Sequence, residues 1–276
     1  MVGGQLAAAA APGCVSALIR NGAADLGSFA PSTRRLALEL PGFPGYLQRM
    51  SITAPTTLAA TVHNLSRQPS LLNPILAEIR DKEVQQDRLR FRRNLERAGA
   101  IFAYEISKVL SYVERDVLTP LGTARVPVLA EQPVIASILR AGLPLHQGLL
   151  NYFDQADNTF ISAYRKHEGD ADHFEVEIEY LSSPSVEGRT VILCDPMLAT
   201  GSSMVLAYRA LLARGCPAHL HVVAVIASEQ GVRFALDKLP ENATLWVGAI
   251  DRELTARAYI VPGLGDAGDL AFGAKD

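Results

Sequence analysis

The chain has 276 residues, of which 49% are hydrophobic and 20% are charged, which is an ordinary globular composition. The formal net charge of −3 argues against a protein that binds nucleic acid through its overall charge, because such proteins usually carry a basic surface. No apolar run approaches the ~20 residues needed to span a bilayer, so no membrane segment is expected.

Residues 1–50 differ in composition from the rest of the chain. They include the low-complexity run AAAAAPG and show no sustained hydrophobic periodicity. A segment of this kind buries too little apolar surface to fold alone. We therefore expect residues 1–50 to be a disordered N-terminal extension and residues 51–276 to form a single domain.

Residues 73–113 have apolar side chains at three- and four-residue steps, for example at Leu95 and Ala98. This spacing predicts helix, and it fits one long helix or two. Pro120 marks the end of the helical region. The following run, PVLAEQPVIASIL, predicts one or two strands that lead into Arg140.

The next two expected strands, residues 159–164 and 174–180, are joined by the charged loop RKHEGDADH. We expect them to form a mobile β-arm over the active site. Strands and helices then alternate along residues 191–195, 204–214, 221–227, 229–238 and 244–248. This alternation predicts an α/β fold, with a mostly parallel sheet flanked by helices. Ligands of such folds bind beyond the carboxyl ends of the strands.

The run VILCDPMLATGSSM, residues 191–204, describes a strand, a small loop and a helix start. Thr200–Ser203 supply hydroxyls and main-chain N–H groups at the helix N-terminus, which favours phosphate. Asp195, at the strand end, can accept hydrogen bonds from sugar hydroxyls. The run lacks both the G-x-x-x-x-G-K-[ST] and the G-x-G-x-x-G motifs. It predicts a site for a ribose 5′-phosphate, although TGSS alone also fits an ordinary capped helix start.

Three strings resemble motifs of the uracil phosphoribosyltransferase family. DPMLATGSS resembles the family's loop for phosphoribosyl pyrophosphate (PRPP), ILRAGL resembles its pyrophosphate-side loop, and YIVPGLGDAGD resembles its uracil-binding segment. The resemblance covers roughly residue 74 to the C-terminus and makes Met50 a natural start. It implies the type I phosphoribosyltransferase fold, with a β-arm and a C-terminal base-binding segment.

The resemblance implies an enzyme of pyrimidine salvage that transfers the 5-phosphoribosyl group of PRPP to uracil, giving UMP and pyrophosphate. Positioning and electrostatics supply most of this chemistry without a covalent nucleophile. Mg²⁺ is expected, held mainly by the substrate pyrophosphate and water. We expect a cytoplasmic homo-oligomer, a dimer or larger, that binds uracil and PRPP but neither nucleic acid nor membrane. Control by a nucleotide such as GTP is left open.

The resemblance also assigns roles to individual residues. The catalytic residues are Asp195, Arg140 and Asp266. PRPP binding is assigned to Arg140, Arg165, Asp195, Pro196, Met197, Leu198, Ala199, Thr200, Gly201, Ser202, Ser203 and Asp266. Uracil binding is assigned to Tyr259, Ile260, Gly265, Asp266 and Ala267. Ser202 stands where the family more often has a second glycine, so its backbone must suit serine.

Other interpretations compete with this one. The chain could be a transferase for another base, although PGLGDAGD argues against it. It could also be a nucleotide-binding regulator without turnover, which binds RNA; the net negative charge and the presence of Arg140 and Arg165 count against that. His219 and His221 share one strand face and could bind a metal, but structural histidines are the preferred interpretation.

Overall fold

The computed structural model describes residues 61–167 and 174–274, with only the main chain described for residues 163–167 and 174–177. The expected extension, residues 1–50, therefore lies outside the described residues. So do the first ten residues of the expected domain and residues 168–173 of the predicted arm.

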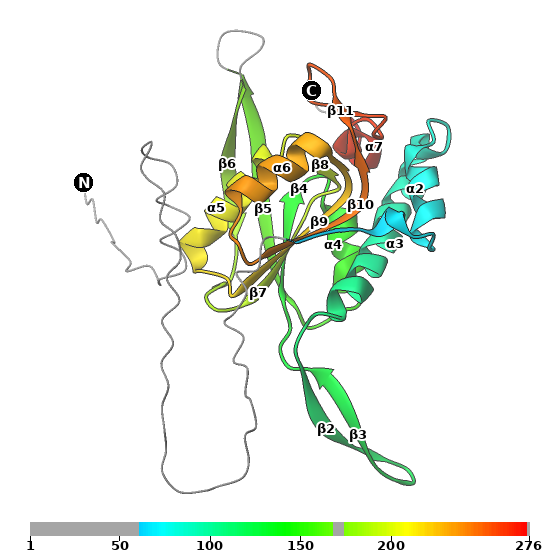
Figure 1. The fold of residues 1–276 in the computed structure, drawn as a ribbon, viewed down its shortest axis with the longest axis vertical. Coiled ribbons are helices and arrows are strands. Elements are labelled where there is room, and N and C mark those ends of the chain that lie inside the picture. Colours follow the sequence, from blue (N-terminus) through cyan, green and yellow to red (C-terminus); the bar gives the residue numbers. More distant parts are fainter. Residues whose placement is uncertain (1–60, 168–173, 275–276) are drawn as a thin grey trace, which may run out of the picture.

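An eight-stranded sheet forms the centre of the fold (Figure 1). The strand order is β1-β10-β9-β7-β4-β5-β6, and the short β8 pairs with β9. All these pairs are parallel except β5–β6, which is antiparallel. The strands are β1 (Thr61–Asn64), β4 (Val134–Leu139), β5 (Asp157–His167), β6 (Phe174–Ser182), β7 (Thr190–Cys194), β8 (Met197–Leu198), β9 (His219–Ser228) and β10 (Ala243–Asp251).

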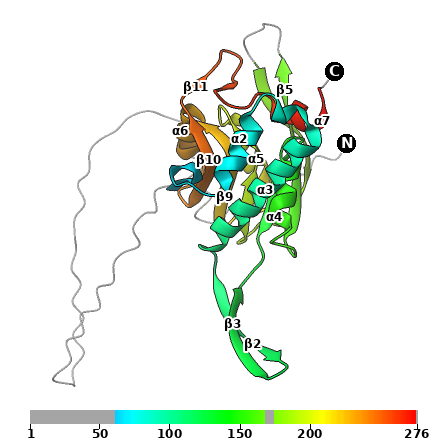
Figure 2. The same cartoon turned by 90° about the vertical axis from the view of Figure 1, so that its right-hand side faces the viewer.

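Helices cover both faces of this sheet, as the turned view in Figure 2 makes clear. One face carries α2 (Leu72–Arg80), α3 (Arg88–Ser107) and α4 (Leu143–Leu150), and the other carries α5 (Ser202–Leu211) and α6 (Glu229–Lys238). Short 3₁₀ turns are η1 (Leu65–Arg67), η2 (Val84–Gln86) and η3 (Leu212–Arg214). The predicted fold class, a mostly parallel sheet flanked by helices, is confirmed.

Two hydrophobic cores result, one on each face of the sheet. Within β7, Ile192 and Cys194 join the core under α3, whereas Val191 and Leu193 join the core under α5. The central strands are therefore apolar on both faces, as buried parallel strands are. None of the described helices is long and apolar enough to cross a membrane.

The helical pattern of residues 73–113 divides into two helices and the start of a strand. Between α2 and α3, the Asp81 carboxylate accepts hydrogen bonds from the N–H groups of Glu83 and Val84, at 2.8 and 3.1 Å. Asp87 then caps α3 by accepting from the Arg90 N–H at 3.0 Å. Because side chains that bond to nearby main chain compete with the helix, these two aspartates break the periodic run.

The hairpin of β2 (Tyr112–Thr119) and β3 (Gly122–Leu129) is not predicted from the sequence. These strands form a separate two-stranded antiparallel sheet that extends from the body, at the opposite end from β11 (Glu253–Leu254) and α7 (Ala267–Phe272) (Figure 1). Every residue of β2 before Thr119 is exposed. A strand with no buried face shows none of the alternation on which a strand prediction depends.

The two histidines considered as metal ligands lie on β9. Trp246 Nε1 donates a hydrogen bond to His221 Nδ1 at 3.1 Å, and His219 Nε2 lies 3.0 Å from the Thr244 hydroxyl oxygen. The His63 ring stacks on Trp246 with centroids 4.2 Å apart. Among the described residues, no group of three or more His, Cys, Asp or Glu side chains could hold a metal ion. The two histidines thus pack and form hydrogen bonds inside the sheet, on β9 between β10 and β7.

Burial lowers the pKa of His221 to about 3, helped by the nearby His219 and His63. Because this folded-state pKa lies below the unfolded value, the neutral ring stabilises the fold above about pH 6.5, and this stabilisation is lost as the pH falls toward 3. Between pH 8 and pH 5 we expect the wild type to lose about 2 kcal/mol more stability than His221→Gln. Urea unfolding followed by fluorescence of Trp246, the sole tryptophan, measures this loss.

The glutamine keeps an acceptor for Trp246 Nε1, so the variant is matched at that hydrogen bond. Equal losses of stability in the two proteins would contradict the account of His221.

Candidate functional site

Asp195 lies directly after β7, at the carboxyl edge of the sheet. Its main-chain N–H donates to Val223 O at 3.1 Å, which keeps the residue in line with the neighbouring β9. Its carboxylate Oδ1 accepts from the Met197 N–H at 3.2 Å, which turns the chain into β8. The preceding Cys194 is a buried free thiol that packs as a small apolar side chain.

The loop after Asp195 ends at the N-terminus of α5. Gly201 precedes the helix with a φ of +84°, a conformation that favours glycine. Thr200 Oγ1 accepts from the Ser202 N–H at 3.3 Å, and the two hydroxyl oxygens lie 3.1 Å apart. The N-cap residue Gly201 offers no side chain to cap α5, so the first-turn N–H groups other than that of Ser202 are available to an anion.

Ser202 has an ordinary backbone conformation. It is the first residue of α5, and Ala258 is the sole non-glycine residue with a positive φ among the described ones. The serine therefore fits this position without strain, and the glycine that is commoner in the family is not required here.

The start of α6 supports this loop from behind. Ser228 Oγ donates to Ala199 O at 2.5 Å and accepts from the Gly231 N–H at 2.8 Å. A Cβ atom on Gly231 would overlap the carbonyl oxygens of Leu198 and Ala199. Glycine at position 231 thus lets α6 contact the main chain of the loop directly. These contacts hold the loop in position at the end of the sheet.

Arg140 belongs to a second loop at the same edge. It follows β4, which pairs with β7 so that Ser137 lies opposite Cys194. A Cβ atom on Gly142 would lie 2.6 Å from Ile138 O and 3.1 Å from Cys194 O, so the loop turns back tightly against both strand ends. The loops of Arg140 and Asp195 therefore lie side by side.

The Arg140 side chain reaches the C-terminal segment. Its Nη2 donates to Gly273 O at 3.2 Å and lies 3.5 Å from Asp269 Oδ1. The guanidinium is half-buried, and its Nε has no partner among the described residues. Arg165 is part of β5 and pairs with Val176 of β6; only its main chain is described.

The C-terminal segment begins with β11 (Glu253–Leu254), which pairs with β12 (Ile260–Val261), and ends in α7 (Ala267–Phe272). Asp266 Oδ1 caps α7 by accepting from the Asp269 N–H at 3.0 Å. Ile260 and Ala267 are buried. Tyr259, Gly265 and Asp266, which lie beside or between these two buried residues, are exposed.

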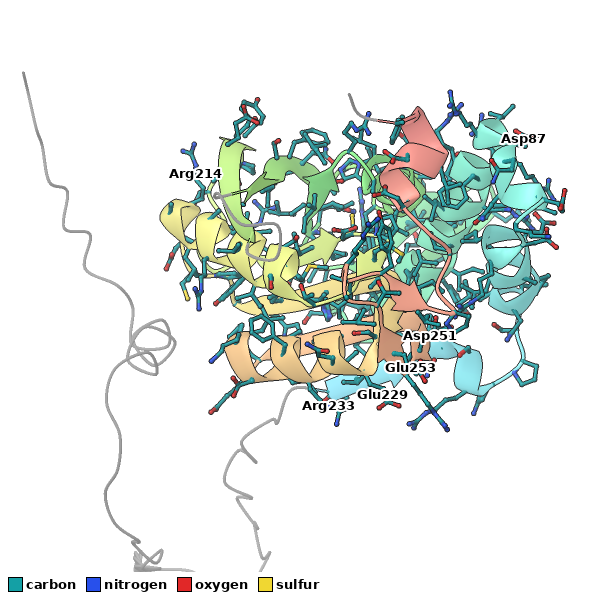
Figure 3. All side chains as sticks on the ribbon, turned by 90° about the horizontal axis from the view of Figure 1, so that it is seen from above. Asp87, Arg214, Glu229, Arg233, Asp251 and Glu253 are labelled. Carbon is teal, nitrogen blue, oxygen red and sulfur yellow. The ribbon has the colours of Figure 1, made fainter. Side chains whose placement is uncertain are left out.

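Figure 3 looks onto this end of the molecule from above. It shows Glu229 and Arg233 on α6 beside Asp251, the last residue of β10, and Glu253, the first residue of β11. Two loops and one C-terminal segment from distant parts of the sequence thus meet at the carboxyl edge of the sheet.

The electrostatics of Asp195 are unusual. Its partial burial raises its pKa to about 7, the Met197 N–H opposes this rise, and the negative charge of Asp266 adds to it. Asp195 and Asp266 are thus close enough to interact across the site. A cationic or strongly hydrogen-bonding ligand between them would relieve both the burial and the repulsion.

The three segments of the site are predicted from the sequence, but the residues that support them are not. Ser228 and Gly231 are not among the predicted site residues. Ser228 could have been predicted, because a serine at a strand–helix boundary is a helix-capping signal. The steric role of Gly231 has no signal in the sequence, because the residues it touches lie about 30 positions earlier in the chain.

Comparison with known proteins gives consistent matches. A family model described as "Uracil phosphoribosyltransferase" matches residues 66–274. A uracil phosphoribosyltransferase from Porphyromonas gingivalis is 53% identical over 214 residues, which is 78% of this chain and 99% of that protein. One from Thermococcus gammatolerans is 38% identical, over 77% of this chain and 93% of that protein. The structure of the AQ2163 protein from Aquifex aeolicus is 30% identical with a TM-score of 0.69, over 77% of this chain and 98% of that one.

Replacing Asp195 by asparagine should stabilise the ligand-free protein at pH 8. Its folded-state pKa lies above its unfolded value of 3.8, so stability is fully present below that value and is lost as the pH rises through about 7. We expect Asp195→Asn to raise the stability by about 1–3 kcal/mol at pH 8, after allowance for partial exposure, and to change it little at pH 4.

Thermal unfolding at the two pH values measures this effect, with the exposed Asp154→Asn as the matched control. A melting temperature of Asp195→Asn at or below that of the wild type at pH 8 would refute the raised pKa.

Proposed function

This chain belongs to the uracil phosphoribosyltransferase family, and from that premise we propose that it transfers the 5-phosphoribosyl group of PRPP to uracil, giving UMP and pyrophosphate. The observation that supports this most strongly is the meeting of three segments at one edge of the sheet. Arg140 joins them, because it follows β4, borders the Asp195 loop and bonds to the C-terminal segment.

PRPP would bind across the two loops. The uncapped N–H groups at the start of α5, with Thr200, Ser202 and Ser203, suit a 5′-phosphate. Asp195 suits the ribose hydroxyls. These hydroxyls would donate hydrogen bonds to its carboxylate and so stabilise the ionised form. In the substrate complex we therefore propose that Asp195 is ionised, with a pKa below the value of the free protein.

Pyrophosphate would leave toward Arg140 and Arg165. An arginine guanidinium stays charged at all working pH values and binds phosphate oxygens bidentately. Negative charge grows on the leaving group as the bond to the ribose breaks, and fixed positive charge lowers the energy of that state. Arg140 would exchange its contact with Gly273 O for the pyrophosphate, since its guanidinium is only half-buried.

Uracil would be read by the main chain of residues 259–267, with Asp266 directed toward the phosphoribosyl group. A main-chain carbonyl that accepts from uracil N3–H would face the unprotonated N3 of cytosine, and the two acceptors would then oppose each other. The proposed segment therefore distinguishes uracil from cytosine without any specialised side chain.

Mg²⁺ fits this site as a companion of the substrate. Asp195 and Asp266 interact across the site, but no described group of three or more side chains could hold the ion alone. The substrate's pyrophosphate oxygens and water would supply the remaining ligands, as is usual for Mg²⁺. When bound, the ion would neutralise part of the leaving-group charge.

We further propose a cytoplasmic homo-oligomer. The exposed apolar side chains of the β2–β3 hairpin, among them Val113, Leu118 and Leu121, support an assembly in which this hairpin is covered.

The function is tested by incubating the purified protein with Mg²⁺, PRPP and a panel of bases. We expect uracil to yield UMP and pyrophosphate, and cytosine to yield no nucleotide because its N3 lacks the proton. Chromatography of the nucleotide products measures both. Turnover of another base without turnover of uracil would refute the assignment, and UMP binding without any turnover would favour the regulator.

Gly231→Ala tests the support of the phosphate loop. The added methyl group would push against the carbonyl oxygens of Leu198 and Ala199, so we expect the KM for PRPP to rise on the order of ten-fold or more. The exposed Gln230→Ala on the same helix is the matched control and should leave this KM unchanged. A folded Gly231→Ala protein with a wild-type KM would show that the loop does not depend on this contact.

A further inference from the structure

Both polar main-chain groups of Gly263, which lies within the base-binding segment, are bound by an ion pair. Asp251 Oδ2 accepts from the Gly263 N–H at 3.0 Å, and Arg80 Nη1 donates to Gly263 O at 3.0 Å. The two side chains also bind each other twice, from Arg80 Nη1 to Asp251 Oδ2 at 2.8 Å and from Arg80 Nη2 to Asp251 Oδ1 at 2.9 Å. Two side chains 171 positions apart thus enclose one residue.

These side chains come from rigid elements. Asp251 is the last residue of β10, and Arg80 is the last residue of α2. The Asp251 side chain is 8% exposed and that of Arg80 is 24% exposed, so the pair is largely shielded from water. A buried ion pair is weak evidence for stability, because desolvation of the charges offsets their attraction. The planar fork of arginine, in contrast, fixes geometry well.

A second contact holds the next residue. With its amide oriented to satisfy both partners, Gln85 Nε2 donates to Leu264 O at 2.9 Å and to Ile79 O at 3.0 Å. Leu264 itself is buried in the core beneath α2 and α3. The main chain at residues 263–264 is therefore tied to the end of α2 at successive peptide groups.

The position of this anchor matters for recognition. Gly263 lies between Ile260 and Gly265, whose main-chain groups are proposed to read the base. Such groups cannot adjust their direction by changing rotamer, so their alignment depends on how the segment is held. An anchor in the middle of the segment sets the directions of the groups on both sides.

We propose that Arg80 and Asp251 are positioning residues that determine the affinity and selectivity for the pyrimidine base. This inference rests on the proposed function. Neither residue touches the reacting atoms; they act through the Gly263 peptide. PRPP is held mainly by the loops after β4 and β7, and Asp266 is the one proposed PRPP residue on the anchored segment.

Arg80→Lys and Asp251→Asn test this proposal. A lysine lacks the planar fork of arginine, so it cannot donate to both Asp251 and Gly263 O in the same geometry. It keeps a positive charge opposite Asp251. Arg90→Lys is the matched control, because Arg90 makes a bidentate pair with Glu78 of α2, both contacts at 2.7 Å, and among the described residues neither side chain is hydrogen-bonded to residues 259–267. Steady-state kinetics with both substrates, and calorimetric binding of UMP and of ribose 5-phosphate, are the measurements.

We expect Arg80→Lys to raise the KM for uracil about ten-fold or more, the factor for a lost charged hydrogen bond, while the KM for PRPP stays unchanged. The affinity for UMP should fall by a similar factor, and that for ribose 5-phosphate should not fall. The ratio of kcat/KM for uracil to that for cytosine should also fall. Arg90→Lys should show none of these effects.

Three results would overturn the inference: an unchanged KM for uracil, equal rises in both KM values, or the same changes in Arg90→Lys. If Asp251→Asn does not fold, Arg80→Lys alone decides. Failure of the wild type to form UMP would contradict the proposed function, whereas an active wild type with unaffected variants would contradict this inference alone.

Discussion

The site depends on glycines that let main-chain segments approach closely at the carboxyl edge of the sheet. Gly142 turns the Arg140 loop against the ends of β4 and β7, and Gly231 lets α6 rest on the loop that precedes α5. Any larger residue would separate these segments. Because the two loops are joined in this way, a ligand that spans them meets fixed partners and requires little reorganisation of the protein.

The charges of the site are arranged for a ligand and are unfavourable without one. Asp195 is shielded from water and faces the negative charge of Asp266, which together raise its pKa. Arg140 bonds to the C-terminal segment but leaves its Nε without a described partner. Such features reduce the stability of the free protein. A substrate that offers hydroxyls to the acid and phosphates to the arginine would correct both, which is how a site of this kind gains affinity.

Much of the fold followed from the sequence, because the alternation of strand and helix after residue 190 and the run around Asp195 are local patterns. The hairpin of β2 and β3 escaped prediction because it has no buried face. Arg80 and Asp251 escaped because their meaning arises from contacts across 171 positions, to which no local pattern corresponds. The role of Arg165 stays a prediction, since its side chain lies outside the described residues.

A crystal structure of the protein with UMP bound tests the central claim most directly. The account predicts the phosphate at the N-terminus of α5, the ribose hydroxyls on Asp195, and the uracil edge against the main chain between Ile260 and Ala267, with the Gly263 peptide still held by Arg80. A base that lies away from this segment, or a phosphate bound elsewhere than the start of α5, would contradict it.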